Sequence, residues 1–145
     1  DDLGLSYSVT QGITAPSKAE ELTVYAISPA GNAPKGTTIN VKIYSLIPAT
    51  KPGGLSAAPA GPYTASQSVT ISWPAYSGCP SNKTFESYNI AIENGVVTST
   101  NPVPAGTTSA TITLRSDPGT TKVSYTASCS GSPSPVSDVL TLTVP

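Results

Sequence analysis

The stretch that decides the fold is LTVYAISPAGNAPKG at residues 22–36, followed closely by INVKI at residues 39–43. Apolar and polar residues alternate on both sides of a Pro/Gly-rich loop, which is the pattern of two β-strands and their connection. The same ending recurs near the C-terminus, where VSYTASC at residues 123–129 leads through a Gly/Ser/Pro loop to VLTLTV at residues 139–144. The sequence therefore indicates two related β units.

The composition favours an all-β chain without a nucleic-acid or membrane role. A length of 145 residues suffices for one ordinary domain and part of another. The 15 Pro and 12 Gly punctuate alternating Val, Ile, Tyr and Thr segments, which is typical of a sandwich. Charged residues make up 10% and the net charge is −1, so we expect no nucleic-acid partner. Apolar runs fall far short of the roughly 18 residues of a membrane span, so we expect no membrane insertion.

Residues 53–145 carry the alternation of a complete sandwich. Strands are expected near residues 53–59, 68–73, 85–92, 96–97, 110–114, 123–129 and 140–144. Asn94-Gly95 is the strongest short hairpin signal, so it predicts a type I′ turn with the return strand beginning at Val96. Trp73 continues the apolar face of Val69 and Ile71, which predicts that its indole is buried between the sheets.

Three features carry a resemblance to the fibronectin type III family over residues 53–145. They are Trp73, the Tyr88-x-Ile90-x-Ile92 strand and the ending at residues 123–144. The resemblance implies a Greek-key, immunoglobulin-like β-sandwich. One position departs from the family, which usually begins strand F with a tyrosine; here that position holds Thr121, and Tyr125 is expected to take over part of the packing.

Residues 1–45 resemble only strands E, F and G of such a domain, and they contain no segments for strands A to C. We therefore expect three parts: an incomplete fibronectin type III-like segment at residues 1–45, a Pro/Gly linker at 46–54 and a fibronectin type III-like domain at 55–145. The absence of an initiator Met and of a signal peptide favours a processed form or part of a longer protein.

Three strands cannot close a sandwich, so their apolar side chains predict an interface. At about 1.5–3 kcal/mol for each buried side chain, more than about 10 kcal/mol is left unrealised. Strands of a longer parent chain could cover this set, another molecule could do so, or the segment could pack as a small extra sheet on the second domain. The candidate interface residues are Leu3, Leu5, Tyr7, Val9, Leu22, Val24, Ile39, Val41 and Ile43.

The residues that catalysis and metal binding require are scarce. The chain has no His, which excludes a Ser–His triad, and its seven Lys and Arg are scattered. Zinc prefers His or closely spaced Cys, and Ca²⁺ prefers a looped series of acidic residues, neither of which the sequence offers. We expect no enzyme activity, no catalytic residue, no metal site and no cofactor.

The resemblance places Cys79 in the B–C loop and Cys129 at the start of the F–G loop, which are neighbours at one end of the fold. It therefore implies a Cys79–Cys129 disulfide, as in an oxidising extracellular setting. Asn82-Lys83-Thr84 is a glycosylation sequon in the same B–C loop. The two F–G loops supply candidate partner contacts at Pro29, Asn32, Lys35, Ser132 and Ser134.

Three functions fit a non-enzymatic extracellular, cell-surface or virion module. In the first, the chain is a filament or surface subunit that other copies complete by β-strand addition. In the second, it is an excerpt of a tandem array in a surface adhesin, a phage tail or decoration protein, or the spacer of a secreted polysaccharide-degrading enzyme. In the third, it binds a ligand through the B–C and F–G loops. The expected partner is protein, first of all further copies of the chain; carbohydrate is conceivable but nothing in the sequence indicates it.

Overall fold

The computed structural model describes residues 4–145, and β-strands supply almost all of its regular structure. The chain forms two compact units. The N-terminal unit contains the residues up to Pro48 together with residues 80–82, and the C-terminal unit contains residues 49–79 and 83–145. The boundary after Pro48 falls inside the linker expected at residues 46–54. The all-β prediction is confirmed.

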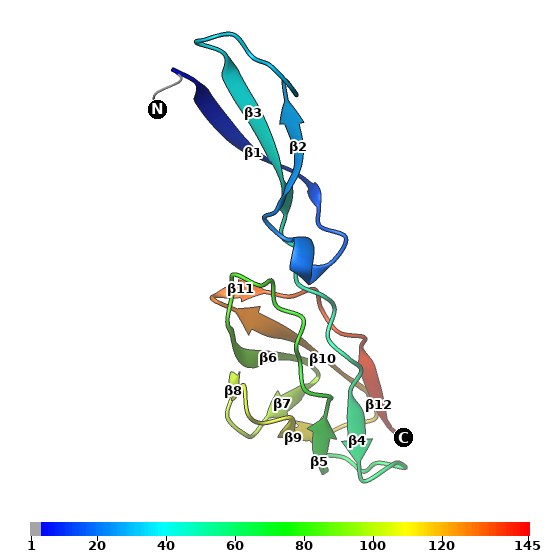
Figure 1. Ribbon diagram of the computed structural model, residues 1–145. Helices are drawn as coiled ribbons and strands as arrows, with labels where there is room; N and C mark the ends of the chain where they lie inside the picture. The colour runs from blue at the N-terminus through cyan, green and yellow to red at the C-terminus, as the bar shows by residue number, and fades with distance from the viewer. Residues whose placement is uncertain (1–3) are drawn as a thin grey trace. The chain divides into compact units, whose positions relative to one another are not determined.

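The C-terminal unit is a sandwich of two sheets (Figure 1). The first sheet has the order β4-β5-β9-β7, with β4 at Ser56–Ala58, β5 at Ser68–Ser72, β9 at Ser109–Leu114 and β7 at Gly95–Val97. The second has the order β11-β10-β6-β8, and β12 also pairs with β10; its strands are β11 at Ser132–Pro133, β10 at Gly119–Cys129, β6 at Phe85–Glu93, β8 at Val103–Pro104 and β12 at Leu140–Val144. All pairings in both sheets are antiparallel.

An aromatic cluster fills the space between these sheets. Trp73 follows β5 and is 5% exposed, which confirms its predicted burial. Its ring centroid lies 5.2 Å from that of Tyr88 on β6 and 5.2 Å from that of Tyr125 on β10. Such tilted and edge-to-face pairs stabilise beyond the area they bury. Because one indole contacts two strands of the opposite sheet, β6 and β10, it helps to fix how the two sheets face each other.

The hairpin predicted at Asn94-Gly95 does not form. Asn94 has a positive φ of 55°, as expected for this dipeptide, but the following strand β7 pairs with β9 rather than returning along β6. The chain thus crosses from one sheet to the other at Asn94. The edge of β6 that a hairpin strand would have occupied is instead paired with β8, at Tyr88 opposite Val103.

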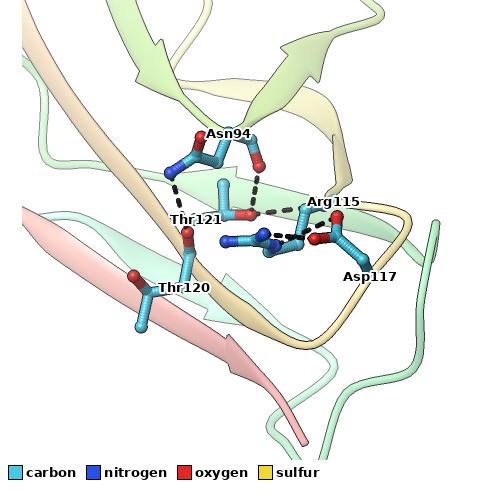
Figure 2. A network of polar contacts seen from close by, with 5 residues as sticks. All are labelled: Asn94, Arg115, Asp117, Thr120 and Thr121. Atoms are coloured by element: carbon cyan, nitrogen blue, oxygen red, sulfur yellow. Dashed lines mark hydrogen bonds and ion pairs between the residues drawn. The ribbon is translucent and has the colours of Figure 1, made fainter.

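Thr121 closes the end of the sandwich where the resembled family has a tyrosine (Figure 2). Its side chain is fully buried on β10. The Thr121 hydroxyl donates to the backbone oxygen of Asn94 over 2.7 Å and accepts the backbone N–H of Arg115 over 3.3 Å. One hydroxyl therefore ties β10 both to the sheet crossing at Asn94 and to the turn after β9.

Side chains also complete the edges of the second sheet. Between β11 and β12, Ser134 and Ser137 are buried, and their hydroxyls accept the backbone N–H groups of Ala127 and Tyr125 over 2.9 and 3.0 Å. Their own N–H groups donate to the carbonyls of the same two residues over 2.8 and 2.9 Å. Two serines thus replace strand pairing along this part of β10.

A disulfide joins Cys79, in the loop between β5 and β6, to Cys129 at the end of β10. The two Cα atoms lie 5.7 Å apart, and no free cysteine occurs among the described residues. The predicted pairing is present in the structure.

The N-terminal unit is a three-stranded sheet of order β1-β3-β2 (Figure 1). Strand β1 spans Ser6–Thr14, β2 spans Val24–Ser28 and β3 spans Thr38–Ser45; a short 3-10 helix, η1 at Lys18–Glu20, lies between β1 and β2. Strand β3 pairs antiparallel with β2 and parallel with β1. The expected match of β1 to strand E needs correction, because strand E belongs to the sheet opposite F and G, whereas β1 lies beside β3 in the same sheet.

Replacing Thr121 by Val removes the two hydrogen bonds of its hydroxyl and keeps the side-chain shape. We expect Thr121→Val to lower the free energy of unfolding by about 1–3 kcal/mol, because partly buried backbone groups of Asn94 and Arg115 lose their partner. Urea unfolding followed by Trp73 fluorescence measures this. Thr120→Val is the matched control and should change the value by less than about 0.5 kcal/mol. Equal effects of the two variants would contradict the role given to Thr121.

Alkaline pH should destabilise the protein through Tyr125. Burial and, to a smaller extent, the neighbouring Tyr88 raise the pKa of Tyr125 to about 12, against about 10 in an unfolded chain. Its contribution to stability is therefore complete below about pH 10 and is lost as pH rises toward 12. In Tyr125→Phe, the thermal midpoint should fall less between these pH values than in the wild type. An equally steep fall in the variant would exclude this cause.

The disulfide should carry a large share of the stability of the C-terminal unit. It closes a loop with a sequence separation of 50 residues, which corresponds to about 4 kcal/mol on the chain-entropy model. Reduction should add about 2 Da to the intact mass. The double variant Cys79→Ser/Cys129→Ser should lose a comparable amount of unfolding free energy in urea. Free thiols that react with an alkylating agent in the native, unreduced protein would refute the pairing.

Candidate functional site

The sheet of the N-terminal unit presents one apolar face. Strand register places Tyr7 beside Ile39 and Val9 beside Val41, so these four side chains point to the same side. Across the antiparallel pair, Ile27 lies opposite Val41 and Val24 opposite Ile43. We define the apolar face by the seven residues Tyr7, Val9, Val24, Ile27, Ile39, Val41 and Ile43.

The apolar face is open to solvent. Tyr7 is 77% exposed, Ile27 53%, and Val9 and Val24 52% each. The three residues on the central strand, Ile39, Val41 and Ile43, are only half-buried. Scattered exposed apolar side chains are ordinary on a protein surface, but a contiguous set across three strands is a candidate docking surface.

The opposite face of the same sheet is polar and partly closed. Ser6 lies beside Thr38 there, and their hydroxyls are 2.9 Å apart. Tyr25 and Tyr44 stack with ring centroids 4.7 Å apart, and the Tyr25 hydroxyl lies against Gly12 so closely that a Cβ atom would not fit. The two faces therefore differ in kind, and only the apolar face has the character of the inside of a sandwich.

Both outer strands of this sheet also have an unpaired edge. Within residues 4–145, β1 and β2 each pair only with β3. A free edge exposes backbone N–H and C=O groups that can accept an additional strand. The N-terminal unit thus offers an apolar surface and two backbone ladders.

The predicted interface residues fall into three groups. Tyr7, Val9, Val24, Ile39, Val41 and Ile43 all lie on the apolar face. Leu5 and Leu22 lie outside the strands, and Leu22 has a positive φ of 60°. Leu3 lies outside the described residues. The prediction missed Ile27 because the register of β2 shifts between Val24 and Ala26, which interrupts the alternation that the sequence displays.

The predicted loop contacts differ in how exposed they are. Pro29, Asn32 and Lys35 are exposed in the loop between β2 and β3. The prediction for Ser134 is wrong, because this residue is buried and its hydroxyl is engaged by Ala127. Ser132 is half-buried and accepts a hydrogen bond from Lys83. The sequon residue Asn82 is exposed, and its glycosylation stays a prediction.

A hollow of about 400 Å³ lies beside β7 and β9 and includes Asn94, Arg115 and Asp117. The Arg115 guanidinium donates two hydrogen bonds to the carboxylate of Asp117 (Figure 2). These hydrogen bonds hold the pKa of that carboxyl below its usual value. The carboxylate is thus engaged by its own neighbour, and the hollow has no aromatic wall. It is a weaker candidate than the apolar face.

Among residues 4–145, no three His, Cys, Asp or Glu residues are grouped so that they could hold a metal ion, and no helix is long and apolar enough to cross a membrane. A scan against protein-family models and a search of curated proteins both find no match to this chain. The candidate site therefore rests on the geometry of the N-terminal sheet.

Proposed function

We propose that the protein is a non-enzymatic structural subunit of an extracellular or virion assembly, and that copies associate through the apolar face of the N-terminal sheet. One observation carries the proposal: seven apolar side chains on three adjacent strands point to one side and stay accessible. The disulfide Cys79–Cys129 supports an oxidising location.

A second copy is the occupant that this face fits best. Two identical sheets can pack face to face about 10 Å apart, with the side chains of both apolar faces interleaved. A two-fold axis would give each copy the same contacts, which is how most homo-oligomers close. The face carries no charge, so the two copies would meet without a buried ion.

The C-terminal unit fits a structural role better than ligand binding by loops. Of the loop residues proposed near the disulfide, Ser134 is occupied in completing the edge of β10 and Ser132 binds Lys83. The side chains of its core are buried, and they include the aromatic cluster of Trp73, Tyr88 and Tyr125. Such a unit serves as a rigid, disulfide-closed spacer.

Lysine on the apolar face should disperse the assembly. We expect wild-type protein to be multimeric by light scattering, and Tyr7→Lys or Ile27→Lys to be monomeric, because each would bury an ammonium group in the interface. Both positions are exposed within one chain, so folding should be unaffected. Ser8→Lys and Ser28→Lys lie on the opposite face of the same strands and should leave the multimer intact.

Trp73 fluorescence should be the same in all four variants, since it reports the C-terminal unit. A wild-type protein that is monomeric at high concentration would refute association between copies. That result would favour the tandem-array alternative, in which strands elsewhere in a longer chain cover the apolar face.

A further inference from the structure

Strand β1 contributes almost nothing to burial within its own chain. All nine of its residues, Ser6–Thr14, are exposed. It pairs on one side only, with β3, where residues 6–11 lie in parallel register beside residues 38–43. The strand is therefore held mainly by its backbone hydrogen bonds, and it would be equally well held by β3 of another copy.

Burial of the apolar face alone is modest for a stable interface. Three strands of 9, 5 and 8 residues, about 4.8 Å apart, give a face of roughly 350 Å², so two such faces meet over roughly 700 Å² in total. Stable protein interfaces bury at least about 1,200 Å². An assembly built on this face thus benefits from a further link between copies. An exchanged β1 adds no backbone hydrogen bond, but it ties the two chains together, so they can separate only when β1 leaves the facing sheet.

The connection after β1 is long enough to reach a facing copy. Residues 15–23 lead from β1 to β2. Ala15, Leu22 and Thr23 bond to β3, so the free part is residues 16–21, which include the short helix η1; unwound, this part spans up to about 20 Å. The distance between two packed sheets is only about 10 Å. The segment could therefore carry β1 from the sheet of its own chain to the facing sheet.

From these three observations we infer that β1 is exchanged between copies. Residues Ser6–Thr14 of one copy lie beside β3 of a second copy, in the parallel register that pairs Ser8 with Asn40. Every backbone bond of β1 is kept, but it now joins two chains, which is the low-cost exchange of an identical element. This inference rests on the proposed association through the apolar face, and it names the strand that locks the association.

Engineered cysteines at Ser8 and Asn40 test the exchange. Both residues are exposed and point away from the apolar face, so a bridge between them reports only that β1 lies beside β3. Neighbouring Cα atoms about 4.8 Å apart are within disulfide range. The described residues hold no free thiol that would compete.

The Ser8→Cys and Asn40→Cys variants are unfolded in urea, mixed in equal amounts, refolded together and oxidised. We expect a cross-linked dimer on a non-reducing gel, with a peptide joining positions 8 and 40 by mass spectrometry. Each variant refolded alone should give no such peptide. Ser8→Cys mixed with Lys42→Cys is the register control, since Lys42 pairs with Thr10 and lies diagonally from Ser8. It should give little or no cross-linked dimer.

The double variant Ser8→Cys/Asn40→Cys separates the two proposals. The exchange is refuted if the double variant forms the bridge only within single chains and the mixture of single variants gives no cross-linked dimer. If light scattering of the wild type still shows a multimer in that case, association through the apolar face stands. A wild-type protein that is monomeric by light scattering refutes both. A cross-linked dimer in the mixture, together with a multimeric wild type, supports both.

Discussion

A sheet with one apolar face gains stability by burying that face, and only the C-terminal unit does so within its own residues. In the C-terminal unit, Trp73 inserts between the sheets and contacts Tyr88 and Tyr125 on the opposite side. The burial of this cluster gives the sandwich its fixed geometry, and the alternating Val and Ile of β5 and β9 pack around it. In the N-terminal unit, the same kind of face stays open on a single sheet, so its burial requires something beyond residues 4–48.

Once the sheets are fixed, the remaining problem is the backbone at their edges, and small polar side chains solve it. Thr121, Ser134 and Ser137 bind backbone groups where strand pairing ends. The amide of Asn101 does the same for Ile90 on β6, donating to its carbonyl and accepting its N–H over 3.0 Å each. Buried backbone groups without partners are costly, so these hydroxyls and amides are structural. Some of the many Ser and Thr hydroxyls in this chain are therefore bound to its own backbone and are not available to a ligand.

The sequence predicted what depends on alternation and missed what depends on distant partners. Alternation located β5, β6, β9, β10 and β12, the burial of Trp73 and six residues of the apolar face. It could not reveal that β7 pairs with β9, because Asn94 adopts the same positive φ in a hairpin and in a sheet crossing. Ile27 escaped for a related reason, since a bulge shifts register without leaving a distinct residue type. The prediction for Ser134 failed because a serine in a loop is expected to be exposed, and the sequence does not show that its hydroxyl accepts the N–H of Ala127 on β10.

The contrast between the units also supports the proposal that the N-terminal sheet joins chains. In the C-terminal unit, β10 has a neighbouring strand on both sides, and its buried residues alternate with half-buried or exposed ones. In the N-terminal unit, β1 has no buried residue and β2 has one free edge. Strands of the first kind stabilise a domain, because removing one would expose its core. Strands of the second kind lose little when they leave their own sheet, so the same hydrogen bonds that hold β1 in one copy are available to hold two copies together.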